Sequence, residues 1–290
     1  MIDLGILGLD TSHPGAFADV IEAHEAASLA AVWDGGDVRD EEYVTEFCGR
    51  HDATHVNEPG DMLEAVDAAM VLTVNWDDHP ELAKPFLDAG MPVFIDKPIA
   101  GRLSDVQAIR EAADGARLFG GSAIPHHPEL AALEAGQRRR TFAIGYNDPF
   151  YYGVHLTDTL RWLAGGDWTC VAPGHDALTA TVYFQNGSTA VIDVDGPDAF
   201  GEFGFLDVTD EVAAVTTGGG GSGTLYERFI GHVIEGIRSG RDECQWLLDA
   251  ATLLLGVHAA WEYRQPVTPA SPALEAVDVS GADFLERYRS

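Results

Sequence analysis

A lysine at the end of an apolar segment is the first residue of this chain that points to chemistry. Only two of the 290 residues are lysine, and one of them, Lys97, follows the segment Phe94-Ile95-Asp96 and precedes Pro98. The segment predicts a short buried strand, and in an open parallel sheet ligands bind in the crevice outside the strand ends. An ammonium group there is a compact donor whose pKa can be tuned by burial, which an arginine cannot supply. The sequence therefore predicts a functional need for an ammonium at this position.

A histidine on a predicted helix is the second candidate. His155 and Asp158 are three residues apart, so they share one face of the helix, and the leucines around them follow helical spacing. The two polar side chains flank the apolar face and can point at a cleft. Histidine titrates near neutral pH and can carry a proton. A single histidine so placed is more often a structural residue, but together with Lys97 it becomes a candidate proton carrier.

The turn after the first predicted strand contains the residues that would meet a dinucleotide. A dinucleotide-binding turn reads Gly-x-Gly-x-x-Gly, and here it begins at Gly8, with Asp10 and His13 in place of the second and third glycines. Asp10 brings a negative charge towards the position of a pyrophosphate, whereas Thr11 and Ser12 add hydroxyl donors to the free N–H groups of the following helix. The residues leave open whether the turn binds a cofactor or only caps the helix.

Two further positions fit a dinucleotide at strand ends. Asp34 closes the second predicted strand, where a carboxylate can accept hydrogen bonds from both ribose hydroxyls of NAD and disfavours the 2′-phosphate of NADP. The alternative is an ordinary loop aspartate in an acidic chain. Asn75 follows the fourth strand and can bond a ribose or a carboxamide, and His79 begins the next helix, where it need not have a ligand. Tyr151, Tyr152 and His126 can line the same cleft, with packing or surface roles as the alternative.

The elements that must position these residues alternate between strand and helix over the first 120 residues, which predicts an α/β fold with a doubly wound parallel sheet. After residue 121 the pattern changes to helices and antiparallel strands joined by an Asn186-Gly187 hairpin turn, which predicts a separate α+β domain. We therefore expect a Rossmann domain over residues 1–121 and a second domain over residues 122–290. The predicted strands cover residues 2–9, 29–33, 55–56, 69–74, 93–95, 117–119, 177–185, 189–194, 203–208 and 211–216; the longest predicted helices cover residues 41–50, 80–89, 104–113, 154–163, 229–238 and 246–263.

Composition excludes several classes of function. The formal net charge of −30 predicts repulsion of nucleic acid and of anionic membranes. An acidic surface with almost no lysine is typical of a protein from a halophile, the alternative being an ordinary acidic cytoplasmic protein. The three cysteines form no CxxC pair, so neither a disulfide framework nor a thiolate metal site is expected, and we predict no metal site. No signal peptide or apolar run of about 18 residues is present, so we expect a cytoplasmic protein. The run Arg138–Arg140 predicts a loop or an oligomer contact.

Taken in order, these segments resemble the Gfo/Idh/MocA family of NAD(P)-dependent oxidoreductases, the group of glucose–fructose oxidoreductase and inositol dehydrogenase. The most specific matches are the Asp96-Lys97-Pro98 strand end and the helix that reads Gly153-Val154-His155-x-x-Asp158. The chain departs from the family at Tyr151, where many members have an aspartate. The other matching segments are Gly5–Gly8, Ala31–Asp34, Asn75 with His79, Ala89-Gly90, Trp162-Leu163 and Gln265–Val267.

The resemblance implies a Rossmann domain followed by a domain with an open, mostly antiparallel sheet, whose exposed face forms a homodimer or homotetramer. It implies that Lys97 orients the substrate hydroxyl and the nicotinamide, and that His155 takes or returns the hydroxyl proton. The cofactor is expected to be NAD rather than NADP, bound by Gly8, Asp10, Thr11, Ser12, His13, Asp34, Asn75, His79, Asp96, Lys97 and Pro98. The substrate is expected to contact Tyr151, Tyr152, Asp158 and His126.

The expected function is hydride transfer between NAD and a secondary alcohol of a sugar, polyol or related small hydroxylated molecule. Two alternatives remain open from the sequence. The first is a ligand-binding or assembly protein that has lost the cofactor, which the altered glycine turn favours. The second is cleavage of a glycoside assisted by bound NAD, as in some relatives of the family.

Overall fold

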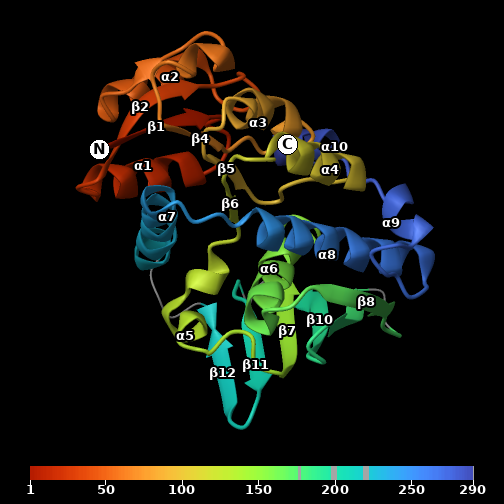
Figure 1. The fold of residues 1–290 in the computed structure, drawn as a ribbon. Helices are drawn as coiled ribbons and strands as arrows, with labels where there is room; N and C mark the ends of the chain where they lie inside the picture. Colours follow the sequence, from red (N-terminus) through yellow and green to blue (C-terminus); the bar gives the residue numbers. More distant parts are fainter. Residues whose placement is uncertain (176–177, 197–200, 218–221, 290) are drawn as a thin grey trace.

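Two six-stranded sheets form the frame of the chain, as the computed structural model shows (Figure 1). The structure describes residues 1–175, 178–196, 201–217 and 222–289. Residue 177, where the sequence predicts a strand to begin, lies outside these residues. Within the described ranges, no helix combines the length and the apolar character that a membrane span requires.

The first sheet is parallel, with the strand order β3-β2-β1-β4-β5-β6. This is the order of a dinucleotide-binding Rossmann sheet, so the predicted fold of the N-terminal part is confirmed. Its central strands are buried along their length, which explains why they read as continuous apolar runs. The strands are β1 (Ile2–Leu7), β2 (Ala27–Trp33), β3 (Thr54–His55), β4 (Ala68–Val71), β5 (Val93–Asp96) and β6 (Leu118–Gly121).

Helices cover both faces of this sheet. On one face, Phe94 of β5 meets Phe17 of α1 (His13–Ala23) and Phe229 of α7 (Ser222–Ser239). On the other face, Ile95 belongs to the core that includes Phe86 of α3 (His79–Asp88). The remaining elements around the sheet are α2 (Glu41–Arg50), the 3-10 helix η1 (Pro59–Met62) and α4 (Leu103–Ala112).

The second sheet is mixed and mostly antiparallel, with the order β12-β11-β7-β10-β9-β8, as expected for the C-terminal part. One pair, β7 with β10, is parallel. The strands are β7 (Arg140–Tyr146), β8 (Trp168–Pro173), β9 (Thr179–Phe184), β10 (Thr189–Gly196), β11 (Gly204–Val208) and β12 (Val212–Thr216), and the helical elements beside them are η2 (Ile124–His126), α5 (Pro128–Ala131) and α6 (Gly153–Ala164).

The sequence predicts a loop or an oligomer contact at residues 138–140, but the structure differs for two of the three arginines. Arg140 begins strand β7, and the side chain of Arg139 is buried. The Arg139 guanidinium lies 2.9 Å from Oδ2 of Asp207, whose other carboxylate oxygen accepts a hydrogen bond of 2.8 Å from Thr141. A buried arginine needs such a partner, and a partner on β11 is invisible in the local sequence.

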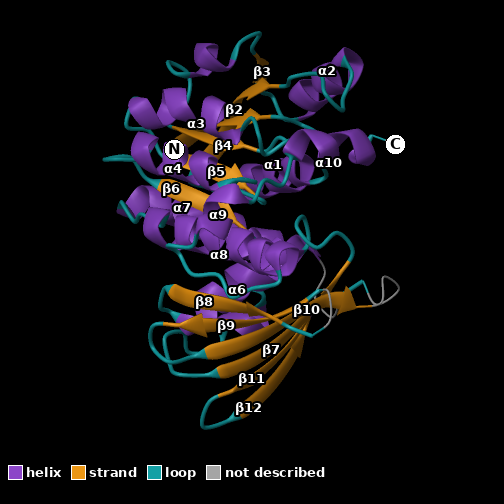
Figure 2. Cartoon of the chain, turned by 90° about the vertical axis from the view of Figure 1, so that its right-hand side faces the viewer, coloured by secondary structure: helices purple, strands orange, loops and turns teal. Residues whose placement is uncertain are grey.

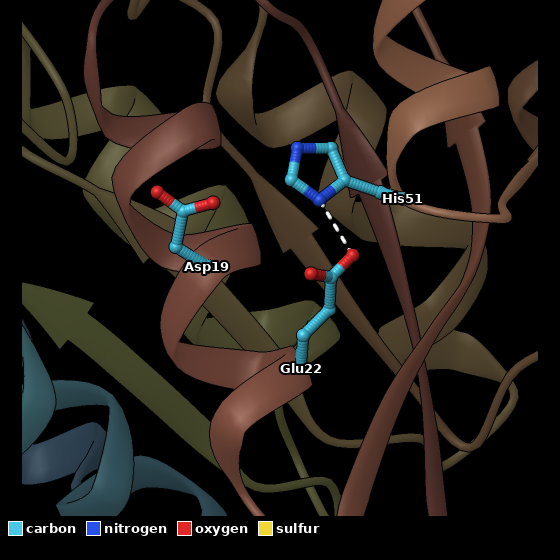
Figure 3. A group of neighbouring side chains, drawn as sticks. All are labelled: Asp19, Glu22 and His51. Carbon is cyan, nitrogen blue, oxygen red and sulfur yellow. Dashed lines mark hydrogen bonds and ion pairs between the residues drawn. The ribbon is translucent and has the colours of Figure 1, made fainter.

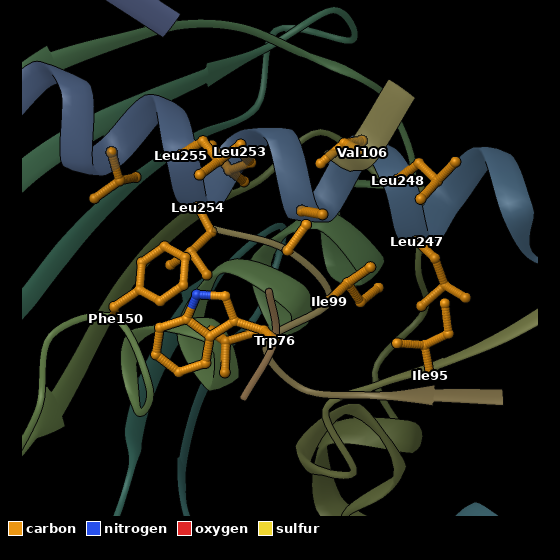
Figure 4. Close-up of a cluster of buried hydrophobic side chains, with 14 of the residues drawn as sticks. Trp76, Ile95, Ile99, Val106, Phe150, Leu247, Leu248, Leu253, Leu254 and Leu255 are labelled. Carbon is orange, nitrogen blue, oxygen red and sulfur yellow. The ribbon is translucent and has the colours of Figure 1, made fainter. Parts of the chain in front are cut away.

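A long apolar helix, α8 (Cys244–Tyr263), joins the two halves of the molecule. It lies between the two sheets (Figure 2) and packs against β6, α4, α6 and β8. Its leucines belong to one core with Ile95 of β5, Ile99 after β5, and Trp76 and Phe150 near the junction (Figure 4). The helix is apolar around most of its circumference because both of its sides are buried.

After α8 the chain returns to the first sheet. The sequence did not predict the two helices of this segment, α9 (Pro272–Ala276) and α10 (Gly281–Tyr288). Asp77, in the loop after β4, accepts hydrogen bonds from the backbone N–H groups of Gly281 and Ala282 at the start of α10. Arg289, just after α10, pairs with Asp37 at 2.7 Å. The C-terminal segment therefore lies over loops at the carboxyl ends of β4 and β2.

Candidate active site

A cleft of about 300 Å³ lies at the carboxyl ends of the parallel strands, between the start of α1, the end of β5 and helices α6 and α7. Its position is the one at which open parallel sheets bind ligands. Another hollow, of about 390 Å³, lies on β11, β12 and the segment before β7, away from the candidate residues. Fourteen of the residues that line the cleft carry polar or aromatic side chains: Thr11, Ser12, His13, Phe17, Asp96, Lys97, Tyr146, Tyr151, Tyr152, His155, Phe203, Tyr226, Phe229 and Tyr288.

Lys97 enters this cleft directly after strand β5 and is 7% exposed. Its Nζ atom lies 3.3 Å from the centroid of the Tyr151 ring and 5.6 Å from that of Tyr152. Burial lowers the pKa of Lys97 to about 8, although the charges of Asp96 and Asp148 oppose this shift. The ammonium is thus charged at neutral pH but close to the range in which it can lose a proton.

Tyr151 occupies the position at which the resembling family often has an aspartate. One face of its ring meets the Lys97 ammonium, and the ring stacks on Phe284 of α10 with centroids 4.4 Å apart. Burial raises the pKa of its hydroxyl, so Tyr151 is neutral. An aromatic ring thus stabilises the ammonium without supplying a carboxylate.

His155 lies on α6 on the other side of the cleft. Its Nδ1 atom is 2.6 Å from Oγ of Ser122, the residue that follows strand β6. Burial and the nearby positive charge of Lys97 lower the pKa of His155 well below the usual value. The imidazole is therefore neutral and can accept a proton. Sequence reasoning did not select Ser122, although it follows the end of β6 as Lys97 follows the end of β5.

Asp158 does not line the cleft, so its predicted contact with substrate is not supported by the structure. Its Oδ2 atom accepts a hydrogen bond of 2.7 Å from the backbone N–H of Ser122. The side chain is buried, and burial raises its pKa to about 7. Asp158 thus fixes the backbone of Ser122, which contacts His155, and it acts on the site only through Ser122.

A second histidine enters the cleft from the first turn. His13 lies at the start of α1, and its Nδ1 atom is 2.6 Å from Oδ2 of Asp96. Burial alone would raise the pKa of Asp96, but the charge of His13 and its hydrogen bond, followed by the charge of Lys97, lower it overall. The sequence selected both residues separately as cofactor ligands, but their pairing across 83 residues appears only in the fold.

The two aspartates of the predicted nucleotide site are engaged with the backbone. Asp10 is buried, and its Oδ2 accepts a hydrogen bond from the N–H of Val74, so it points into the protein rather than towards a pyrophosphate. Burial raises its pKa to about 6. Asp34 accepts hydrogen bonds from the N–H groups of Leu9 and Gly36. Neither aspartate lines the cleft, although Asp34 remains partly exposed at the end of β2.

Gly8 and Pro98 are also structural in this fold. Gly8 has a φ of +95°, and a Cβ atom there would lie 2.6 Å from the side chain of Thr73. The glycine therefore permits close packing of the ends of β1 and β4. Pro98 is buried directly after Lys97, and neither residue 8 nor residue 98 lines the cleft.

Three other predicted positions lie outside the cleft. The Asn75 amide donates a hydrogen bond to the Asp78 carboxylate and accepts one from the backbone N–H of Asp77, so it stabilises the loop before α3. His79 is fully buried, with its two ring nitrogens each 3.0 Å from a backbone carbonyl oxygen, which leaves neither free for a ligand. His126 packs on Phe229 and His232 and lines a different hollow, beside Arg228 and Trp162.

A group of possible metal ligands lies elsewhere. Asp19 and Glu22 of α1 and His51 after α2 have ligand atoms within 4.8 Å of one another (Figure 3). Nδ1 of His51 is 2.6 Å from the Glu22 carboxylate, and this hydrogen bond accounts for their proximity. None of the three lines the cleft.

Comparison with known proteins agrees with this geometry. Residues 2–119 match the model of the Gfo/Idh/MocA oxidoreductase family, which describes an NAD-binding Rossmann fold. YceM of Salmonella typhimurium, whose name calls it an oxidoreductase, is 26% identical over 179 residues, which is 57% of this chain and 57% of the relative. The match thus spans little more than half the length of that relative.

Solved structures resemble nearly the whole chain. A crystal structure of an NAD-binding oxidoreductase from Klebsiella pneumoniae superposes with a TM-score of 0.74 at 15% identity, covering 93% of this chain and 99% of that one. Myo-inositol 2-dehydrogenase from Lactobacillus plantarum gives a TM-score of 0.69 at 12% identity, with 92% and 99% covered. At these identities the structures establish the common fold. In sequence, residues 2–119 are thus similar to the NAD-binding Rossmann domain of Gfo/Idh/MocA oxidoreductases.

Proposed function

We propose that this chain is an NAD-dependent oxidoreductase of the Gfo/Idh/MocA family that acts on a secondary alcohol of a small hydroxylated molecule. The observation that carries the proposal is a buried ammonium, Lys97, in one cleft with a neutral imidazole, His155, at the carboxyl edge of a Rossmann sheet. An alcohol that loses hydride also loses its hydroxyl proton. A donor that holds the oxygen and a base that takes the proton are the two groups that this chemistry requires.

Residues near the start of α1 fit a dinucleotide in part. The Ser12 side chain makes no capping hydrogen bond to α1, and Thr11 and Ser12 both line the cleft, where their hydroxyls can meet a ligand. Oδ1 of Asp96 is buried and has no hydrogen-bond partner among the described residues, which fits a donor supplied by a ligand. Bound NAD would supply the hydride acceptor, and these residues would hold it.

Within the proposal, Lys97 and His155 divide the work. The Lys97 ammonium donates a hydrogen bond to the substrate oxygen and stabilises the negative charge that develops there as the proton leaves. His155 accepts that proton at Nε2, and its Nδ1 remains bonded to Ser122. This arrangement requires the tautomer in which Nδ1 carries the hydrogen, so that Ser122 Oγ accepts from it.

Aromatic rings dominate the walls of the cleft and favour a ring-shaped substrate. Tyr146, Tyr152 and Phe203 contact one another on the α6 side, and Tyr226 and Phe229 line the α7 side. Such faces stack against the C–H faces of a cyclic polyol or sugar, while the polar groups at Lys97 hold hydroxyls. The relation to myo-inositol 2-dehydrogenase supports a cyclic polyol as the first substrate to try.

Titration with cofactor tests the proposal. We expect NAD to bind the purified protein, and NADP to bind at least about tenfold more weakly, because the Asp34 carboxylate at the end of β2 repels a 2′-phosphate. Isothermal titration calorimetry in molar potassium chloride measures both affinities, and high salt suits a chain of net charge −30. Failure to bind either dinucleotide at millimolar concentration would contradict the proposal and favour a non-catalytic protein on this fold.

Self-association through the second sheet is part of the proposal. One face of this sheet exposes apolar side chains from neighbouring strands, which we call the open face: Phe142, Tyr183, Val191, Leu206, Val208 and Val212. The register places Leu206 opposite Phe142 and Val212 opposite Val208, so the apolar residues are continuous across the strands. A contiguous apolar surface on so acidic a chain is typical of a protein interface. The open face therefore fits a second copy of this chain.

A further inference from the structure

The pair formed by His13 and Asp96 crosses the cleft from the start of α1 to the end of β5. Its hydrogen bond, 2.6 Å between Nδ1 of His13 and Oδ2 of Asp96, joins residues that a dinucleotide-binding turn would not bring together, because glycine is usual at position 13. The Asp96 side chain is 4% exposed and that of His13 is 15% exposed. The pair is thus held on a buried carboxylate but remains open to the cleft.

The turn before α1 is built to hold His13 in this position. Oδ2 of the buried Asp10 accepts a hydrogen bond of 2.8 Å from the N–H of Val74 and so fixes the turn to the end of β4. Oγ1 of Thr11 accepts a hydrogen bond of 3.1 Å from the N–H of His13. The residues that replace the glycine pattern thus act together to place one imidazole.

Aromatic packing fixes the plane of that imidazole. The ring stacks on Phe17 with centroids 5.1 Å apart and meets the edge of Tyr226 at 5.5 Å. Nε2 has no hydrogen-bond partner among the described residues, and His13 lines the cleft together with Lys97 and His155. A substrate oxygen or a water molecule in the cleft is therefore the available partner for Nε2.

A carboxylate bonded to one nitrogen of an imidazole fixes the tautomer and stabilises the positive charge that follows when the other nitrogen takes a proton. Among the residues that the structure describes, no carboxylate bonds His155, whose Nδ1 meets Ser122. It is half-buried and lies near the Lys97 ammonium, where desolvation and that charge make a second positive charge costly. In this cleft a positive charge is costly on His155, whereas the Asp96 carboxylate stabilises a positive charge on His13.

We propose that His13 and Asp96 form a second acid–base pair of this site, which receives the hydroxyl proton of the substrate from His155 through water in the cleft and passes it to solvent. The inference rests on the proposed function and extends it. The O–H bond of the substrate breaks with its electron pair left on oxygen, and the proton forms an N–H bond at Nε2 of His155. That N–H bond then breaks, and water in the cleft carries the proton to a new N–H bond at Nε2 of His13. The charged and titratable groups that lie around His13 in the cleft are Asp96 and Lys97 at the end of β5, His155 of α6 and Tyr226 of α7.

The pair itself is tested without cofactor or substrate. A proton held between Nδ1 of His13 and Asp96 gives a strongly downfield signal in the proton NMR spectrum of the protein. We expect this signal in the wild type and in the control His126→Gln, and its loss in both His13→Gln and Asp96→Asn. A wild-type spectrum without it, or one in which His13→Gln leaves it unchanged, would overturn the pair.

Its catalytic role is tested with His13→Gly, which restores the glycine of a dinucleotide-binding turn. The readout is NADH formation with myo-inositol and a panel of other cyclic polyols and aldoses. We expect kcat at neutral pH to fall by about 100-fold, the usual scale for a lost acid–base group, and to recover in part with added imidazole, while NAD affinity is retained. A purely structural residue would not show rescue by imidazole.

The outcomes separate the two claims. If the wild type binds NAD and oxidises a member of the panel but His13→Gly keeps at least half of its kcat, the second acid–base pair is wrong and the proposed function stands. If the wild type fails to bind NAD, the proposed function is wrong whatever the NMR spectrum shows. If kcat falls without rescue by imidazole and with a matching loss of NAD affinity, His13 supports the turn, and the acid–base role is refuted.

Discussion

Substitution of Lys97 by methionine is expected to lower kcat/KM at least about 100-fold, which corresponds to about 2.7 kcal/mol of lost transition-state stabilisation. Methionine keeps an unbranched apolar chain in the buried position but removes the donor that holds the substrate oxygen. The loss should appear in kcat, with NAD affinity changed by only a few-fold. Steady-state kinetics with the best polyol of the panel, together with calorimetry, measures both quantities.

The chain supplies a matched control for this experiment. Lys84, its one other lysine, is exposed on α3 and pairs with Asp88 on the helix surface. Lys84→Met should therefore keep wild-type kinetics. Equal activity of both variants would remove Lys97 from the mechanism, and equal loss would show that the defect comes from a lowered charge or solubility instead of the site.

Introduction of a charge on the open face is expected to separate the proposed oligomer into monomers. Leu206 is 44% exposed and Phe142 opposite it is 40% exposed, both near the middle of the sheet. The double variant Phe142→Asp and Leu206→Asp would bury uncompensated carboxylates in the interface, which costs several kcal/mol. Light scattering in molar salt should report a dimer or larger for the wild type and a monomer for the variant.

A surface variant away from the open face controls for general charge effects. Thr45 is a suitable position, because it lies on the exposed side of α2 and accommodates an aspartate. Light scattering should show the same oligomeric state for Thr45→Asp as for the wild type. A wild type that is already monomeric at micromolar concentration would contradict the proposed interface.

The parallel sheet was predictable because its central strands are buried on both faces and read as short apolar runs between helices. The second sheet was only partly predictable. Strand β7 begins at Arg140 and was missed because arginines at its start suggested a surface segment, while their buried partner, Asp207, comes 68 residues after Arg139. The short helix α10 was missed for a similar reason, since its stability depends on packing against Trp76 and Tyr151.

The site residues likewise differ in how far the sequence predicted them. Lys97 and His155 were predictable because each follows or lies on a strongly patterned element, and the structure brings them into one cleft. His79 and Asn75 were selected by motif, but local geometry directs their side chains to the backbone and to Asp78. Ser122 could have been found by applying the strand-end rule to β6 as well as to β5.

The altered glycine turn takes on a new meaning in the structure. From the sequence, Asp10 and His13 weaken the argument for a cofactor, because they replace glycines. In the fold, Asp10 faces Val74 and away from a pyrophosphate, and His13 binds the carboxylate beside Lys97. The substitutions therefore belong to one local structure, which adds an ionisable side chain to the cleft.

The most direct test of the account follows the two lysines by NMR. Protein labelled with 13C at lysine Cε gives one signal from Lys84 and one from Lys97, because the chain contains no other lysine. We predict that the Lys97 signal titrates with a pKa of about 8, and that saturating NAD shifts it while the Lys84 signal stays in place. A Lys97 signal that titrates like an ordinary exposed lysine, or that does not move when NAD is added, would contradict the central claim that this buried ammonium meets the cofactor and the substrate.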